Sequence, residues 1–262
     1  MVIFFMKILI TGAAGGIAYL TALTLAERKH MVYLTCHTKN QVKTVKEKLG
    51  NIKNIKVMKV DITKEEDRKK VLDLNIDCLY NHAGIAIGGS IIEADMDDVR
   101  TNFEVNVFSS FRLLQLVLRQ MIDKDKGRIV VMSSLASHFP IPFAGIYSAT
   151  KASITSIVTA LQKEMFLMGT NVKVVLVEPG LYHTGFNQVC LDSKYNNGKY
   201  FKDIKKELYN VEHFILRTFE KKKLDSIVVQ IVRAIEDKFP KKVYRAPFIE
   251  SKLVKIYSMF KS

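Results

Sequence analysis

Short apolar runs rich in β-branched residues alternate with longer, helix-forming segments along most of the chain. The apolar runs are Lys7–Thr11, Met31–Thr35, Ile55–Val60, Ile76–Asn81, Arg128–Ser133 and Val172–Glu178. The segments with apolar residues at helical spacing are Gly16–Arg28, Lys39–Leu49, Lys64–Leu74, Asp97–Met121 and Gly145–Leu167. Strands that alternate with helices indicate parallel βαβ units, and near-continuously apolar strands are typical of a sheet buried on both faces. We therefore predict an α/β fold with a doubly wound parallel sheet and helices on both faces.

The remainder of the chain adds two further predicted helices, Lys202–Lys222 and Leu224–Lys238, and a last strand at Lys242–Arg245, for about seven strands in all. A chain of 262 residues, 48% of them hydrophobic, can bury one sizeable core, so we expect a single domain over residues 1–262. Residues 181–201 show no clear period. Because ligands of such sheets bind outside the carboxyl ends of the strands, we expect a substrate lid at about 181–222.

The first residues, MVIFFMKILIT, are apolar but lack a basic leader, and they run directly into a glycine turn. We interpret them as a buried strand and not as a signal peptide. The longest apolar runs fall short of the roughly 20 residues that span a bilayer. The three cysteines lie far apart with no CxxC pair, which predicts a reducing, cytoplasmic location and no metal site.

The net charge of +14 is concentrated in the last quarter, where residues 194–262 hold 17 Lys and Arg against 8 Asp and Glu. A lysine-coated, solvated surface is the simplest explanation. No zinc finger, recognition helix or aromatic RNA motif accompanies the charge, so we expect no nucleic-acid partner. The basic, partly apolar tail at residues 249–261 is expected to dock on the protein body, with membrane contact as the less favoured alternative.

The first apolar run leads into a glycine-rich turn, TGAAGGIA, that spans residues 11–18 and opens a helix. Glycines allow a tight turn and let backbone N–H groups approach a pyrophosphate, which the positive end of the helix also attracts. A plain strand-to-helix turn rarely needs three glycines within five residues. This turn therefore predicts dinucleotide binding.

The turn resembles the TGxxxGxG loop of the short-chain dehydrogenase/reductase family, with Ala18 in place of the last glycine. Further family motifs follow in order: Asp61-Ile62, Asn81-His82-Ala83-Gly84 in place of NNAG, Asn106, Ser134, Tyr147-x-x-x-Lys151, and Pro179-Gly180 with Thr184. The resemblance covers residues 7–185 and implies a Rossmann-like fold and an NAD(P)-dependent oxidoreductase. The cofactor-binding residues that it implies are Gly12, Ala14, Gly15, Gly16, Ile17, His37, Thr38, Lys39, Asp61, Ile62, Asn81, Ala83, Gly84, Tyr147, Lys151, Pro179, Gly180 and Thr184.

A tyrosine stands four residues before a lysine at Tyr147–Lys151, Tyr195–Lys199 and Tyr257–Lys261. Only the first pair opens a helical segment, where this spacing makes the two side chains neighbours, and only this pair follows the strand end that carries Ser134. An Asn-Asn-Gly turn separates the second pair, and the third lies in the tail. We therefore expect Tyr147 and Lys151 to form the reactive pair.

Carbonyl reduction by hydride transfer creates an alkoxide that must receive a proton. The pKa of tyrosine near 10 is too high for a base near neutrality. Charges about 4.5 Å apart at an effective dielectric of about 20 interact by about 3.7 kcal/mol, or roughly 2.7 pKa units, although desolvation opposes the effect. We expect Lys151, with a positive nicotinamide, to lower the pKa of Tyr147 towards neutrality.

The resemblance implies a role for each catalytic residue. Tyr147 would be the general acid/base, and Lys151 would lower its pKa and bind the ribose hydroxyls. Ser134 would hydrogen-bond the substrate oxygen. Asn106 would hold a water that links Lys151 to solvent.

The stretch after the second apolar run, TCHTKN, decides the expected cofactor. NAD sites usually offer an acid here, and none occurs between Glu27 and Glu47. A carboxylate would repel a 2′-phosphate, whereas His37 and Lys39 supply positive charge and Thr38 a donor. NADP is therefore favoured, with NAD as the alternative.

A cluster of apolar residues is expected to form the substrate wall, namely Phe139, Ile141, Pro142, Phe143, Phe186 and Tyr195. It favours an apolar or bulky carbonyl or alcohol that contacts Ser134, Phe139, Tyr147 and Phe186, although core packing beneath the lid explains these residues equally well. Asp97–Met121 and Gly145–Leu167 resemble the helices at the family's subunit interfaces, which implies a homodimer or homotetramer. A nicotinamide-binding regulatory protein without catalysis is the alternative function, and the intact set of four catalytic residues favours the enzyme.

Overall fold

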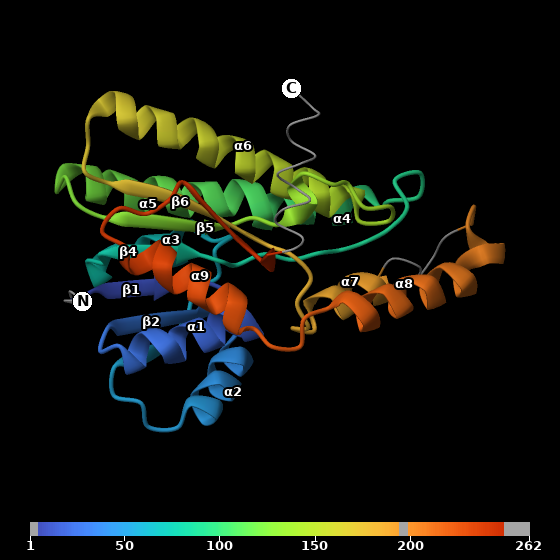
Figure 1. Ribbon diagram of the computed structural model, residues 1–262, viewed down its shortest axis with the longest axis horizontal. Helices are drawn as coiled ribbons and strands as arrows, with labels where there is room; N and C mark the ends of the chain where they lie inside the picture. Colours follow the sequence, from blue (N-terminus) through green and yellow to red (C-terminus); the bar gives the residue numbers. More distant parts are fainter. Residues whose placement is uncertain (1–4, 194–198, 249–262) are drawn as a thin grey trace.

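Within the residues that the computed structural model describes, 5–193 and 199–248, seven strands form one parallel sheet (Figure 1). The spatial order is β3-β2-β1-β4-β5-β6-β7, and every neighbouring pair is parallel. The strands are β1 Lys7–Ile10, β2 Met31–Cys36, β3 Ile55–Lys59, β4 Cys78–Asn81, β5 Arg128–Met132, β6 Lys173–Pro179 and β7 Val243–Ala246. The predicted doubly wound parallel sheet is confirmed.

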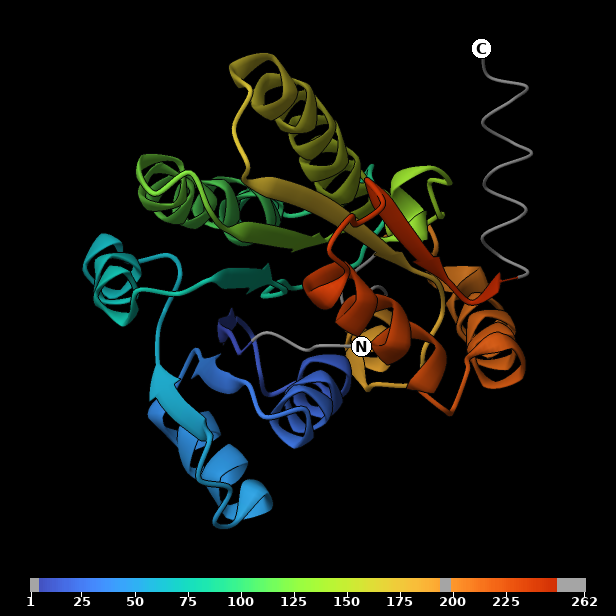
Figure 2. The ribbon, with the colours of Figure 1, turned by 60° about the vertical axis from the view of Figure 1, so that its left-hand side comes forward.

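The helices cover both faces of the sheet, as Figures 1 and 2 show. One core cluster packs α1 (Gly16–Glu27), α2 (Lys39–Leu49) and α9 (Asp225–Glu236) on the sheet. A second packs α5 (Ser110–Asp123) and α6 (Gly145–Met168) on the opposite face, with the segment of α3 (Glu65–Lys70) and η1 (Leu72–Leu74). Successive residues of β1 alternate between these clusters, Ile8 and Ile10 in the first and Leu9 in the second, and all three are fully buried. This two-sided burial explains why the strands read as continuous apolar runs.

The strand order reverses next to β1, because β2 and β4 lie on its two sides. Thr11, just beyond β1, ties the two halves together, since its hydroxyl oxygen accepts hydrogen bonds from the backbone N–H groups of His82 and Ala83, both at 2.9 Å. Ligands of doubly wound sheets bind in the crevice at such a switch point. The fold therefore places the glycine turn and the segment after β4 side by side at the expected binding edge.

Two segments differ from the sequence-based expectation. The predicted helix Asp97–Met121 is interrupted, because α4 (Met96–Phe103) continues into a π-helical turn at Glu104–Ser109 before α5 begins. Residues 181–201, expected to lack regular structure, contain the helix α7 (Phe186–Ser193). This helix is short and holds Asn, Asp and Ser, which have low helix propensity. Beyond it come η4 (Lys202–Ile204) and α8 (Lys205–Phe219), and none of the described helices is both long and apolar enough to cross a membrane.

Candidate active site

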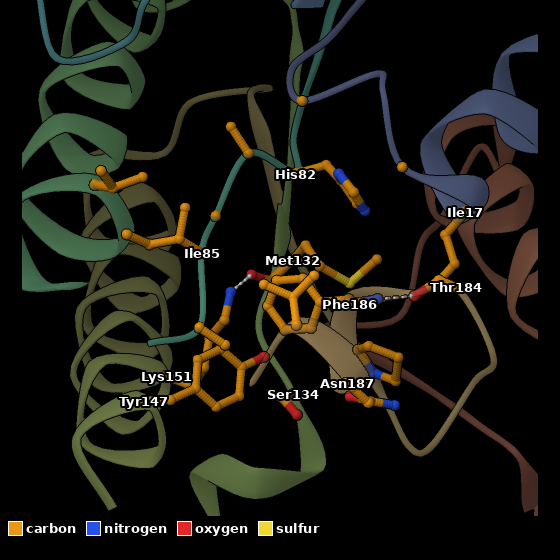
Figure 3. Close-up of a pocket in the computed structure, with 18 of the residues that line it drawn as sticks. Ile17, His82, Ile85, Met132, Ser134, Tyr147, Lys151, Thr184, Phe186 and Asn187 are labelled. Atoms are coloured by element: carbon orange, nitrogen blue, oxygen red, sulfur yellow. Dashed lines mark hydrogen bonds between the residues drawn. The ribbon is translucent and has the colours of Figure 1, made fainter. Parts of the chain in front are cut away.

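A cavity of about 1390 Å³ opens at the carboxyl ends of the strands. Turns after β1, β2, β3, β4, β5 and β6 all contribute to its walls, and Figure 3 shows side chains from several of them converging on it. Of the predicted cofactor residues, those that line it are Gly12, Ala14, Gly15, Gly16, Ile17, His37, Asp61, Ile62, Ala83, Gly84, Tyr147, Lys151, Pro179, Gly180 and Thr184. Thr38, Lys39 and Asn81 are not among the lining residues.

The glycine turn is held close to the segment after β4. Gly12 has a φ of +71°, and a Cβ at this position would lie 2.8 Å from the Cα of Ala83. Gly15 is the N-cap of α1 and brings no capping side chain, so the first N–H groups of this helix are open to the cavity that Gly15, Gly16 and Ile17 line. A helix N-terminus of this kind is suited to bind a pyrophosphate.

The segment from Asn81 to Gly84 has a structural half and a cavity-facing half. Asn81 is buried, and its amide donates to the backbone oxygen and hydroxyl of Ser110 at 3.0 and 2.9 Å. The imidazole of His82 lines the cavity, and its buried Nδ1 has no hydrogen-bond partner among the described residues. Burial, with the nearby Lys151 charge, lowers the pKa of His82 to about 4, so the ring is neutral near pH 7. The wall beside the glycine turn therefore holds a neutral ring whose buried Nδ1 is left unpaired by the described residues.

The rim beyond β2 and β3 carries the predicted adenosine residues. His37 Nε2 lies 3.3 Å from the Asp61 carboxylate. The Thr38 hydroxyl accepts from the backbone N–H of Gln41, and the Gln41 side chain accepts from the Thr38 N–H, which completes a capping box. Thr38 thus serves the helix start. Gln41 also lines the cavity, and the sequence analysis did not name it as a site residue. A threonine followed three residues later by a glutamine is a recognisable signal for a helix cap.

The predicted reactive residues meet in the cavity. The Ser134 hydroxyl lies close enough to the Tyr147 phenol to lower its pKa, and the Tyr147 ring packs against Phe186 with the centroids 5.7 Å apart (Figure 3). Lys151 is buried, its Nζ lies 5.7 Å from the centroid of the Tyr147 ring, and it donates to the backbone oxygen of Met132 at 3.2 Å. Tyr147 and Lys151 lie about one turn apart on α6, and Ser134 follows the end of β5. The fold therefore brings the three side chains together.

The pKa values differ from the sequence-based expectation. Burial raises the pKa of Tyr147 well above its usual value and outweighs the effect of the nearby Ser134 hydroxyl, which lowers it. Burial also lowers the pKa of Lys151 to about 8. The sequence-based expectation counted the attraction between the two charges at a fixed dielectric, whereas in the structure desolvation of the buried phenol dominates. Lys151 alone does not bring the pKa of Tyr147 below its usual value. Without a bound cofactor the phenol therefore keeps its proton and can act as a proton donor.

Asn106 sits in the π-helical turn and is buried. Its amide bridges both backbone groups of Ile85, accepting from the N–H and donating to the oxygen at 2.8 Å each, and also donates to the Thr150 hydroxyl at 3.0 Å. A Cβ on Gly84 would lie 3.1 Å from the Asn106 Oδ1 and 3.5 Å from the Lys151 Nζ. The side chain thus fixes the cavity wall beside Lys151 through contacts within the protein.

The cavity continues towards α7, where apolar side chains form the wall. The expected substrate residues Ser134, Phe139, Tyr147 and Phe186 all line it, together with Ile141 and the unpredicted Met132, Leu181, Asn187 and Val189. Pro142 and Phe143 are not among the lining residues, and Phe143 packs on Phe201 with centroids 5.1 Å apart. The second tyrosine of the repeated pattern, Tyr195, lies outside the described residues, as do Tyr257, Lys261 and the tail.

One buried carboxylate joins the two ends of the segment around α7 and α8. Glu220 accepts hydrogen bonds from His183 Nδ1 at 2.8 Å, Asn187 Nδ2 at 2.6 Å and Gln188 Nε2 at 3.1 Å. The backbone N–H of Lys221 also donates to the oxygen of Leu181 at 3.0 Å. The chain therefore leaves and rejoins the body at one hydrogen-bonded junction.

A doubly wound sheet with a glycine turn at its switch point and a tyrosine–lysine pair in the cavity defines an oxidoreductase that uses a dinucleotide. A family model described as short chain dehydrogenase matches residues 6–194. The chain belongs to the short-chain dehydrogenase/reductase family and is an NAD(P)-dependent enzyme of that family.

Individual relatives support this assignment. The chain is 29% identical over 244 residues to a 3-ketodihydrosphingosine reductase of Bacteroides thetaiotaomicron, covering 90% of this chain and 87% of that protein. It is 34% identical over 164 residues to an NADPH-dependent 1-acyldihydroxyacetone phosphate reductase of Saccharomyces cerevisiae, covering 60% of this chain and 54% of that protein. The fold matches a family member from Burkholderia phymatum solved in complex with NAD, with a TM-score of 0.81 at 20% identity, over 97% of this chain and 94% of that one.

Proposed function

We propose that the protein interconverts an apolar, lipid-like ketone and its secondary alcohol, with NADP(H) as the preferred cofactor and Tyr147 as the general acid/base. The observation that carries the proposal is that Ser134, Tyr147 and Lys151 together line a cavity whose far wall is apolar. A pure dinucleotide sensor has no use for a proton donor at this place. The alternative, a regulatory dinucleotide-binding protein, does not account for this reactive group in the cavity.

The residues present fit a dinucleotide. The open N-terminus of α1 would hold the pyrophosphate, and the rim of His37, Asp61 and Ile62 the adenosine. Lys151 would bind the nicotinamide ribose, with Pro179, Gly180 and Thr184 beside the ring. The unpartnered Nδ1 of His82 is consistent with a ligand at this wall. When bound, the cofactor would supply or accept the hydride.

Three side chains would then manage the proton and the substrate oxygen. Ser134 would hydrogen-bond the carbonyl oxygen and orient it towards Tyr147. Tyr147, whose pKa burial keeps high, would hold its proton until the oxygen becomes basic, which suits the reduction direction. Asn106 would keep the wall at Ile85 in place, so that Lys151 stays within reach of the tyrosine ring.

The proposed substrate class follows from the shape and lining of the cavity. Phe139, Ile141, Phe186 and Val189 make the wall beyond Tyr147 apolar, so a hydrocarbon group would be desolvated there. Two of the relatives described above are named 3-ketodihydrosphingosine reductase and NADPH-dependent 1-acyldihydroxyacetone phosphate reductase, and these names support a carbonyl substrate of this class. A small polar ketone would leave this wall unfilled.

The preference for NADP is supported by His37 at the rim and by the absence of an acid between Glu27 and Glu47. Because the chain contains no tryptophan, the fluorescence of the reduced nicotinamide can be followed on binding with little protein background. We expect NADPH to bind more tightly than NADH. A tighter NADH complex would overturn this part of the proposal.

The central experiment is turnover of a ketone series of increasing chain length by the wild-type protein and by Tyr147→Phe. We expect kcat/KM to rise with chain length, and Tyr147→Phe to lose about 10²- to 10⁴-fold in activity, the usual contribution of a general acid. NADPH affinity should stay near the wild-type value, because the substitution removes one hydroxyl. The matched control is Tyr19→Phe, whose hydroxyl bonds the Lys48 backbone oxygen outside the cavity. Tight binding of NADPH with no turnover of any ketone or alcohol would favour the regulatory alternative.

Two structural proposals accompany the function. Residues 181–222 form a lid of the single domain, supported by the common junction at Glu220.

The protein assembles as a homodimer or homotetramer, supported by exposed apolar side chains on α6 and the π-helical turn, namely Phe108, Phe166, Leu167 and Met168. Light scattering of the purified protein tests the assembly, and a monomer at micromolar concentration would refute it.

A further inference from the structure

The helix α8 presents apolar side chains to solvent along one face. Val211, Phe214, Ile215 and Phe219 are 55%, 65%, 41% and 58% exposed. Their spacing places them on one side of the helix. The helix packs against α7, Leu208 and Leu216 are half-buried, and none of the residues of α8 is buried. Figure 1 shows α8 projecting from the sheet beside α7, so this apolar face has no neighbour in the described body of the protein.

Exposed lysines border the apolar face. Lys221, Lys222 and Lys223 follow the end of the helix after Glu220, and Lys205 and Lys206 open the helix. Two of the acids near the C-terminal half are turned inward, since Glu212 is half-buried and Glu220 is buried in the junction with His183. The exposed surface around residues 211–223 is therefore apolar with a cationic border.

This surface lies beside the mouth of the cavity. The Lys221 backbone donates to the oxygen of Leu181 at 3.0 Å and accepts from the N–H of His183 at 3.1 Å. Leu181 and Tyr182 line the cavity. Whatever covers the apolar face of α8 thus lies next to the entrance.

We propose that α8 and Lys221–Lys223 dock the protein on the surface of an anionic phospholipid membrane. An amphipathic helix with aromatic and aliphatic residues on one face and lysines at its border lies in the membrane interface, with the apolar face among acyl chains and the lysines on anionic headgroups. A second copy of this chain is a poorer occupant, because lysines stand at both ends of the face: an antiparallel two-fold contact would set Lys221–Lys223 of one copy against Lys205 and Lys206 of the other, and a parallel one would set the two triplets together. The inference goes beyond the proposed function, and it would give a membrane-resident substrate a short path to the cavity.

The test is co-sedimentation of the full-length protein with vesicles of phosphatidylglycerol or of phosphatidylcholine. We expect partitioning to the anionic vesicles to be at least about tenfold stronger and to weaken as salt is raised. Ile215→Glu and Lys222→Glu should each reduce it by roughly tenfold. Asn210→Glu, which makes the same charge change as Ile215→Glu but at the polar flank of the apolar face, should change it less than about threefold.

Three outcomes would overturn the proposal. Equal losses in Ile215→Glu and Asn210→Glu would mean that only net charge matters. Undiminished binding in Ile215→Glu would assign it to another part of the chain, such as the tail. Absence of vesicle binding, with Ile215→Glu splitting an oligomer, would assign the face to a second copy. Turnover of a water-soluble ketone is measured in parallel, and a variant that loses it bears on the lid and the proposed reaction, whereas the partitioning to vesicles alone decides docking.

Discussion

Gly12 offers a direct test of how tightly the glycine turn is bound to the segment after β4. Its φ of +71° lies in the left-handed region, and a Cβ there would lie 2.8 Å from the Ala83 Cα and 3.3 Å from the Ala83 Cβ. Both obstacles are fixed parts of the backbone region, so the contact cannot be relieved by rotating a flexible side chain. Gly12→Ala should therefore suffer from strain and from overpacking together.

The two contributions can be separated with a second glycine. Gly169, at the end of α6, has nearly the same φ of +70°, but a Cβ there would meet no atom of the described residues within 4 Å. Gly169→Ala should cost only the left-handed strain, roughly 1–2 kcal/mol. Gly12→Ala adds an overpacking cost of about 1–3 kcal/mol, for a total of roughly 2–5 kcal/mol.

The measurement is urea unfolding of both variants followed by circular dichroism, at equal protein concentration and without cofactor. The free energy of unfolding should fall clearly more in Gly12→Ala than in Gly169→Ala, and the affinity for NADPH should fall in Gly12→Ala alone. Equal losses of stability in the two variants would refute the close packing of the turn on Ala83.

Three further predictions concern titrating groups. Because burial raises the pKa of Tyr147, alcohol oxidation, which needs the phenolate, should accelerate with pH between about 7 and 10, and initial rates that are flat over this range would contradict it. Because burial lowers the pKa of His82 to about 4, any change of NADPH affinity around pH 6.5, where the 2′-phosphate titrates, should be the same in His82→Asn, and a transition that this substitution abolishes would show a charged imidazole. Burial of Asp67 favours its neutral form, but hydrogen bonds from Lys59 and Lys70 outweigh this and hold its pKa below the usual range. Its ionised form therefore stabilises the fold above the unfolded pKa of about 3.9, so Asp67→Asn should cost roughly 1–3 kcal/mol at pH 7, and urea unfolding should show this difference shrinking as pH falls below about 4.

The sheet could be predicted because its strands are buried on both faces. Strands such as Arg128–Met132 appear in the sequence as continuous apolar runs, which are easy to recognise. The observed strand ends fall within two residues of the ends predicted from the sequence. The order of the motifs along the chain also placed Ser134, Tyr147 and Lys151 at one edge, since the carboxyl ends of parallel strands meet there.

What the sequence could not predict depends on contacts between distant segments. The helix α7 forms from residues of low propensity, and the Asn187 side chain within it is held by Glu220, 33 residues away. The π-helical turn at Glu104–Ser109 leaves no pattern in the apolar period, and it positions Asn106 against Ile85. The pKa of Tyr147 depends on how far the phenol is desolvated, which spacing alone does not encode.

The junction at Glu220 has a consequence for motion. Because one carboxylate holds both the outgoing chain at His183 and Asn187 and the returning chain at residue 220, neither end can swing out while the other keeps its bonds. Opening would break these contacts at once, so amide protons on both sides of the junction should exchange with solvent as one cooperative unit. The rate of that single event would then set how often substrate and product can pass.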